Sequence, residues 1–129
     1  MAIPQEKVNK SANYLVASID EQAVRQGEVA MQYVLENDPD KKANLQSEFD
    51  ILNDVIYTLG VTLKLFGSGN FMDPRYNLKD KLRERKSFLD SDARKLAVNG
   101  CKTRTDKTVP VRSLVRSSEF IEHALYLLE

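Results

Sequence analysis

Residues 45–66, which read LQSEFDILNDVIYTLGVTLKLF, decide the fold of this chain. Large apolar residues recur along this stretch at alternating spacings of four and three, which is the a/d rhythm of a coiled-coil helix. Further apolar residues beside this row make the apolar stripe wider than a contact with one helix needs. Gly67 and the polar residues after it predict the end of the helix. The row consists of Leu45, Phe49, Leu52, Ile56, Leu59, Leu63 and Phe66, and it is flanked by Ile51, Val55 and Val61.

The residues before this stretch predict a second helical arm. From Glu6 to about Glu36, apolar residues recur at spacings of three and four, which indicates an amphipathic helix. The Asn-Asp-Pro-Asp sequence at residues 37–40 combines turn-forming side chains with a proline and predicts the end of this arm. Because the connection is short, residues 1–66 should form a long antiparallel hairpin. The first arm carries Val8, Ala12, Leu15, Ile19 and Ala23.

The C-terminal half predicts shorter helices. Leucines at helical spacing indicate a helix from about residue 78, and Asp-Ser-Asp at residues 90–92 is a candidate N-cap for a separate short helix. Asn-Gly at residues 99–100 would close that helix, and residues 101–107 are equally typical of a loop and of a short strand. A final helix should follow Thr108. Its apolar stripe consists of Val111, Leu114, Ser118, Ile121, Leu125 and Leu128.

These elements predict an all-α fold in a single helical domain over residues 1–129. A long antiparallel helical hairpin, residues 1–66, is followed by a basic region of shorter C-terminal helices, residues 71–129. Because the apolar stripe of residues 45–66 is wider than one partner helix covers, we also expect copies of the chain to form a helical-bundle homo-oligomer.

The composition limits the class of protein. A length of 129 residues suits one domain, and 42% hydrophobic with 29% charged residues is ordinary for a globular protein. The single cysteine excludes an internal disulfide and is typical of a reducing compartment. The start of the chain has no signal-peptide pattern, and the longest apolar stretch, residues 56–66, is too short to span a bilayer. We therefore expect a cytoplasmic protein that does not contact membranes.

The net charge of zero conceals an uneven distribution. Residues 1–70 hold six basic and ten acidic side chains, whereas residues 74–118 hold thirteen basic and five acidic ones. Clustered cations raise the local positive potential and attract anions, so we expect an anionic partner for residues 74–118. The alternative is a basic surface that meets only water and neighbouring acidic side chains.

Catalytic and cofactor motifs are absent from the sequence. Cys101 and His123 lie on separate segments, and one cysteine with one histidine does not supply a metal site of several spaced ligands. The Gly-Ser-Gly-Asn sequence at residues 67–70 lacks the Gly-Lys of a phosphate-binding loop and indicates a helix end instead. We expect a non-enzymatic protein without a metal or cofactor.

One pair of residues is the exception. Arg116 and His123 are seven residues apart, which places them two turns apart on one side of a helix. This Arg-x6-His pattern resembles the signature of the HEPN family, helical domains that often cleave RNA at a dimer interface. The resemblance implies His123 as general acid and base and Arg116 as the group that stabilises the phosphate. The other interpretation is a surface histidine beside Glu119 and Glu122.

Cations and aromatic residues alternate in the basic region. Lys and Arg bind phosphates, and exposed rings stack on the bases of single-stranded nucleic acid. We expect Tyr76 to be exposed, whereas Phe88 should lie in the core beside Leu89. Arg112 and Arg116 are one helical turn apart, a spacing that suits one phosphate. The candidate binding residues are Arg75, Tyr76, Arg83, Arg85, Arg94, Lys102, Arg104, Arg112 and Arg116.

The order of features along the chain resembles the phage recombination mediator family typified by UvsY. The similarity implies a small helical oligomer that binds single-stranded DNA and helps to load a recombinase onto it. It runs from a lysine pair in the second arm, through an aromatic-glycine turn, to short motifs in the C-terminal half. These pieces are Lys41-Lys42, Phe66-Gly67-Ser68-Gly69, Phe71-Met72-Asp73, Arg75-Tyr76, Phe88-Leu89-Asp90-Ser91-Asp92 with Leu96, and Phe120-Ile121-Glu122.

Two other kinds of partner stay open at this point. The basic region also suits a nucleotide-sized ligand, as in a phage-type sponge that binds a small anionic nucleotide signal. The hairpin suits a protein–protein adaptor or an assembly chaperone. The sequence pattern does not separate an adaptor from a nucleic-acid-binding protein, because both need the same amphipathic helices.

Overall fold

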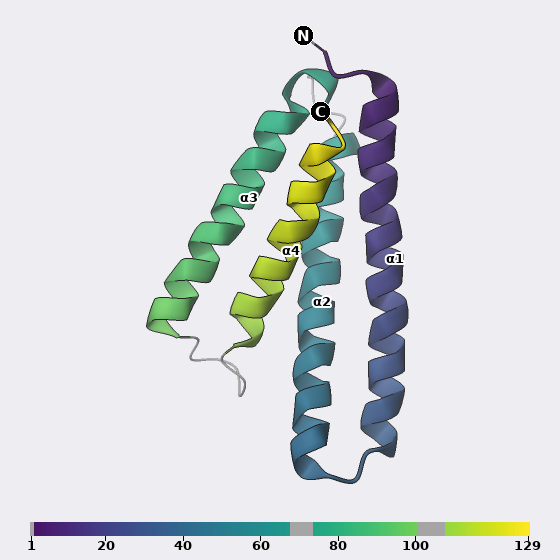
Figure 1. Ribbon diagram of the computed structural model, residues 1–129, viewed down its shortest axis with the longest axis vertical. Coiled ribbons are helices and arrows are strands. Elements are labelled where there is room, and N and C mark those ends of the chain that lie inside the picture. The colour runs from purple at the N-terminus through teal and green to yellow at the C-terminus, as the bar shows by residue number, and fades with distance from the viewer. Residues whose placement is uncertain (1, 68–73, 101–107) are drawn as a thin grey trace.

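The computed structural model describes residues 2–67, 74–100 and 108–129, and these residues form four α-helices and no strand. The all-α fold predicted from the sequence is therefore confirmed. The helices pack as a bundle of two pairs, α1 with α2 and α3 with α4 (Figure 1). The predicted loop or strand at residues 101–107 lies outside the described residues. The helices are α1 (Gln5–Leu35), α2 (Pro39–Gly67), α3 (Pro74–Asn99) and α4 (Val109–Tyr126).

The first two helices form the predicted antiparallel hairpin. α2 begins at Pro39, where the Asp38 carboxylate accepts a hydrogen bond from the Asp40 N–H at 3.0 Å and caps the first turn. The apolar row of α2 packs against α1, in which Leu15 and Val29 are fully buried. With a rise of 1.5 Å per residue, each arm is about 45 Å long.

α4 packs against both α1 and α2 and covers the flank of the α2 row. Ile51 and Val55, which we expected to need another subunit, are fully buried within this one chain. Small side chains on α4 allow this close packing, and the Ser11 hydroxyl donates a hydrogen bond to the Ala124 carbonyl at 2.7 Å. The width of the α2 stripe is therefore no argument for an oligomer.

α3 is one continuous helix, so the predicted break at residues 90–92 is wrong. The Asp90 carboxylate does not cap a new helix but accepts hydrogen bonds from Lys86 at 2.8 Å and from the Ser118 hydroxyl of α4 at 2.5 Å. The predicted end at Asn99 is confirmed. Gly100 follows it with φ +77°, a conformation that favours glycine, and its N–H donates to the Leu96 carbonyl at 2.8 Å.

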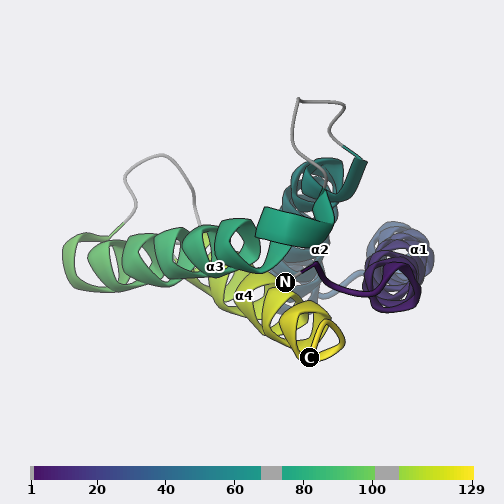
Figure 2. The same cartoon turned by 90° about the horizontal axis from the view of Figure 1, so that it is seen from above.

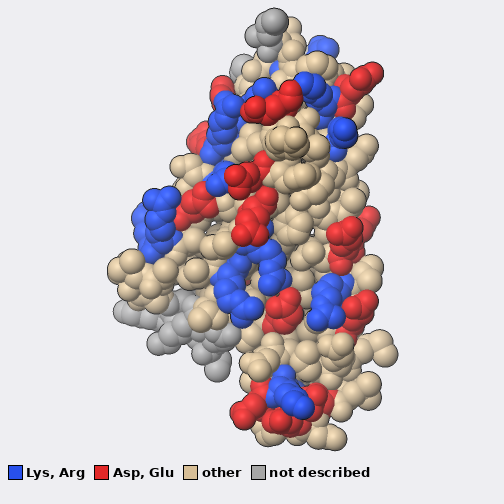
Figure 3. All heavy atoms as spheres, viewed as in Figure 1, with Lys and Arg blue, Asp and Glu red and all other residues tan. Residues whose placement is uncertain are grey.

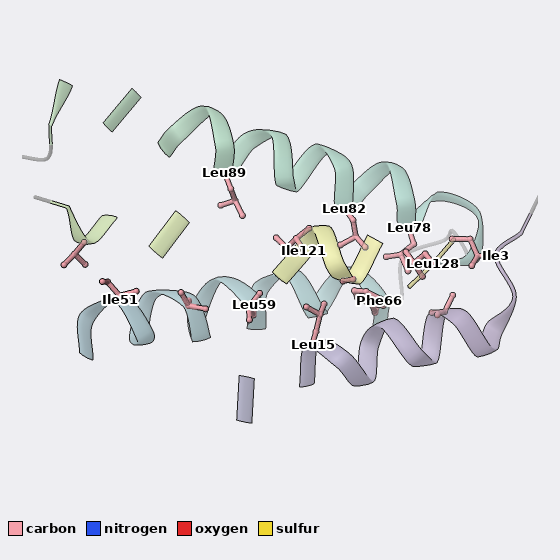
Figure 4. Packing of buried hydrophobic residues seen from close by; sticks show 14 residues of the cluster. Ile3, Leu15, Ile51, Leu59, Phe66, Leu78, Leu82, Leu89, Ile121 and Leu128 are labelled. Carbon is pink, nitrogen blue, oxygen red and sulfur yellow. The ribbon is translucent and has the colours of Figure 1, made fainter. Parts of the chain in front are cut away.

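The shared core lies where the two helix pairs meet. Leu78, Leu82 and Leu89 of α3 point toward α4 and α2, with Leu78 beside Leu128 and with Leu82 and Leu89 on either side of Ile121 (Figure 4). The closed end of the α1–α2 hairpin extends past α4, and α3 runs along the opposite edge of the molecule from α1 (Figures 1 and 2). None of the four described helices has the length and apolar run that crossing a bilayer requires.

Candidate nucleic-acid interface

α3 carries most of the described candidate residues. It holds them on one continuous helix, without the break that we expected at residues 90–92. Tyr76, Arg83 and Arg94 are spaced seven and eleven residues apart, which places them on one exposed side of a helix that turns about 100° per residue. Tyr76 is 64% exposed, as expected. Arg75 lies at the start of α3, and its carbonyl accepts a hydrogen bond from the Ile3 N–H at 2.7 Å.

Phe88 is 60% exposed, so the expectation that it lies in the core is wrong. Its neighbour Leu89 takes the buried position, and a rotation of about 100° turns Phe88 away from the contact with α4. Three cations share the flank of α3 on which Phe88 lies. Lys81 and Arg85 come seven and three residues before Phe88, and Lys95 comes seven residues after it. We call these four residues the Phe88 flank.

Other cations of α3 have partners within the protein. Arg83 pairs with Asp80 at 3.5 Å and with the Glu129 side chain at 3.6 Å. The hydrogen bond from Lys86, followed in size by that from the Ser118 hydroxyl, lowers the pKa of Asp90 below its usual value. The hydrogen bond from Ser118 to Asp90 thus joins α4 to α3, and the Lys86–Asp90 pair supports it from within α3. Their main role is in holding the helix pair together.

Arg112 and Arg116 do converge, but on a carboxylate of the same chain. Arg116 Nη1 lies 3.0 Å from Glu48 Oε1, and Arg112 Nη2 lies 3.9 Å from Glu48 Oε2. A phosphate at this pair would have to compete with Glu48, whose side chain is 26% exposed. Glu48 was not among the residues predicted from the sequence, although it lies on α2 one turn before the buried Ile51. Lys102 and Arg104 lie outside the described residues.

Arg116 and His123 face different helices. Arg116 reaches Glu48 of α2, whereas the His123 ring packs against the Tyr14 ring of α1 with their centroids 4.4 Å apart. Tyr126 adds a second ring contact to His123 at 5.9 Å. Both residues therefore have a structural role between helices.

The charge on the face of the molecule shown in Figure 3 is mixed. On the face shown in Figure 3, basic and acidic side chains lie side by side and form no single positive patch. Within residues 2–67, 74–100 and 108–129, no group of three or more His, Cys, Asp or Glu side chains is arranged to hold a metal ion. The distinctive feature of the candidate interface is therefore the combination of exposed rings and cations on α3.

No family model, curated protein or solved structure matches this chain. The resemblances to the recombination mediator and HEPN families stay predictions.

Proposed function

We propose that this protein is a non-enzymatic, single-strand nucleic-acid-binding protein and that α3 is its binding element. The observation that carries the proposal is the exposure of Phe88 between Lys81, Arg85 and Lys95. The Phe88 ring is 60% exposed and sits among cations, a combination that suits a single strand whose bases stack on the ring while its phosphates meet the cations.

The chemistry favours a single strand over a duplex. Stacking on Phe88 and Tyr76 requires bases that can turn outward, and the bases of a duplex are already stacked on one another. Each base–ring stack contributes about 1–3 kcal/mol, and cation–phosphate contacts make binding weaken as salt rises. Loading of a recombinase onto the bound strand is the function that the mediator resemblance adds to this proposal.

Fluorescence anisotropy with labelled poly-dT, a matched duplex and a cyclic oligonucleotide tests the proposal at two salt concentrations. We expect poly-dT to bind best and its affinity to fall with salt. Phe88→Ala and Tyr76→Ala should each weaken poly-dT binding by about 5- to 100-fold, the equivalent of one lost stack. Tyr57→Ala is the matched control, because Tyr57 is a 72% exposed ring on α2 that lines a hollow with Pro110 and Leu114 of α4 and is not part of α3.

The other outcomes separate the competing functions. Tight binding of the cyclic oligonucleotide with weak binding of poly-dT would support a nucleotide sponge. Cleavage of a labelled RNA that disappears in His123→Ala would support a HEPN-like RNase. No binding of any probe at low salt would remove the anionic partner and leave a protein–protein adaptor.

A further inference from the structure

The part of α1 near the closed end of the hairpin has an apolar face that no described helix covers. Val24, Met31, Val34 and Leu35 are 64%, 69%, 76% and 75% exposed. Their exposure shows that the described helices leave them uncovered, and α1 forms one edge of the molecule (Figures 1 and 2). Four large apolar side chains at this exposure form a patch of a few hundred Å², the size typical of an interaction site. With the small residues between them, this outer face consists of Ala23, Val24, Gly27, Ala30, Met31, Val34 and Leu35.

The pattern of the outer face is that of a helix–helix contact. Val24, Gly27, Met31 and Val34 follow spacings of three, four and three, the rhythm of a coiled-coil seam. The charged residues of this half, Glu21, Arg25 and Glu28, lie to the side of the seam. The second apolar stripe of α1 is thus separate from the stripe that packs on α2.

Gly27 lies in the middle of this face without a structural reason in the single chain. Glycine weakens a helix interior relative to alanine, and a Cβ at this position would meet nothing within 4 Å. A glycine is useful on a helix surface where another backbone approaches closely. Ala23 and Ala30 lie one turn before and one turn after Gly27, and their small side chains would also let another helix come close.

We propose that two copies of this chain pair through the outer faces of α1, antiparallel, with the two-fold axis at Gly27. This register places Met31 of one copy opposite Ala23 of the other and Val24 opposite Ala30. Met31 and Val24 then each meet an alanine of the other copy, and Gly27 meets Gly27 at the closest approach. The contact is isologous, so it closes at a dimer.

The charges select the antiparallel orientation. Asp20 lies on the same side of α1 just before the outer face, and the antiparallel register brings it opposite Val34 of the other copy. A parallel pair would instead place Asp20 opposite Asp20, and like charges at a contact are unfavourable.

The size of the contact fits a concentration-dependent dimer. The exposed apolar patches of two copies together approach the lower limit of about 1,000 Å² for a specific interface. A groove of about 220 Å³ between α1 and α2, lined by Ala30, Tyr33, Val34, Gln46 and Phe49, adjoins the seam and can take up side chains of the other copy. α3 lies away from α1, so the pairing leaves the Phe88 flank open in both copies (Figure 2).

Sedimentation equilibrium over a range of concentrations tests the pairing. We expect the wild-type chain to dimerise and Gly27→Arg to raise the dissociation constant at least about tenfold, because a guanidinium would be placed in an apolar contact. The single chain should tolerate this change, since the new side chain enters open space and removes a helix glycine. Val98→Arg is the matched control, because Val98 is 83% exposed on α3 and outside the seam. A wild-type monomer at every concentration, or an unchanged Gly27→Arg dimer, would overturn the proposal.

Cross-linking tests the orientation in a Cys101→Ser background. Ala23→Cys mixed with Met31→Cys should form a mixed disulfide under oxidation, because the antiparallel register places these positions opposite each other. Ala23→Cys alone should cross-link poorly. Efficient cross-linking of Ala23→Cys with itself, without the mixed product, would show a parallel pair and overturn the antiparallel register.

Discussion

The two halves of α1 present different chemistry on the same side of one helix. Over residues 5–20 this side carries Gln5, Asn9, Asn13 and Asp20, all exposed, and one large apolar residue, Val16, which is 43% exposed. Over residues 23–35 the same side becomes the apolar outer face, which is just as exposed. A helix side that meets only water is ordinarily polar. Residues 5–20 therefore fit a side exposed to water, whereas residues 23–35 fit a side that packs against another helix.

The largest difference between the halves should come from one substitution made in each. Leu15 is fully buried and Leu35 is 75% exposed. We expect Leu15→Ala to lower the free energy of unfolding by about 2–5 kcal/mol, the cost of a core cavity. Leu35→Ala should change it by less than about 0.5 kcal/mol in the dilute chain. Urea unfolding measures the free energy of unfolding of both variants. Equal losses would contradict the distinction between a buried and an exposed half.

Acid should weaken the contact between α3 and α4 rather than the α1–α2 hairpin. Because the pKa of Asp90 is lowered in the folded chain, its carboxylate stabilises the fold above the unfolded pKa and loses this effect as the pH falls through the folded pKa. We expect Asp90→Asn to be less stable than the wild type at neutral pH and the difference to shrink as the pH falls through the lowered folded pKa of Asp90.

Urea unfolding at several pH values measures this difference, with Asp80→Asn as the exposed control, since the Asp80 side chain is 83% exposed. Hydrogen exchange of residues 23–35 at neutral pH should be the same in Asp90→Asn and the wild type, because neither α3 nor α4 covers the outer face. A wild-type advantage that stays constant with pH would contradict the role of the Asp90 carboxylate.

Substitutions at two helix glycines, Gly27 and Gly60, separate an effect on stability from an effect on self-association. A Cβ at Gly27 or at Gly60 of α2 would meet nothing within 4 Å. Gly27→Ala and Gly60→Ala should each raise the free energy of unfolding by up to about 1 kcal/mol, since alanine favours the helix. Only Gly27→Ala should also weaken self-association, because only Gly27 lies at the centre of the seam. Sedimentation of both variants decides this, and equal effects on association would place the contact elsewhere.

The smallest effect on stability should come from a substitution at Glu48, which lies on α2 and faces the first turns of α4. Its ion pairs with Arg112 and Arg116 are partly exposed, so Glu48→Gln should cost less than about 1 kcal/mol of stability. The released cations should make poly-dT binding tighter and more salt-dependent, whereas charge reversal of both arginines should weaken it and flatten its salt dependence. Anisotropy that is unchanged in both variants would remove this pair from the binding surface.

Much of the fold followed from local patterns, because each depends on neighbours along the chain. The row from Leu45 to Phe66 and the Asp-Pro turn before it predict the hairpin, and Asn99-Gly100 predicts the end of α3. The expected break at residues 90–92 was wrong for the opposite reason. Asp90 is a good N-cap in isolation, but Ser118 lies 28 residues further along the chain, and only folding brings it to the carboxylate.

For the candidate site, too, some features follow from the sequence and others from the packing of the helices. The sequence by itself determined that cations and rings alternate over residues 74–118 and that Arg112 and Arg116 share one side of a helix. Only the tertiary structure decided that Leu89 rather than Phe88 is buried, that Glu48 meets the arginine pair, and that α4 covers one side of the hairpin while the outer face of α1 stays open. Helix periodicity states which residues share a side, whereas the packing of other helices determines which side is buried.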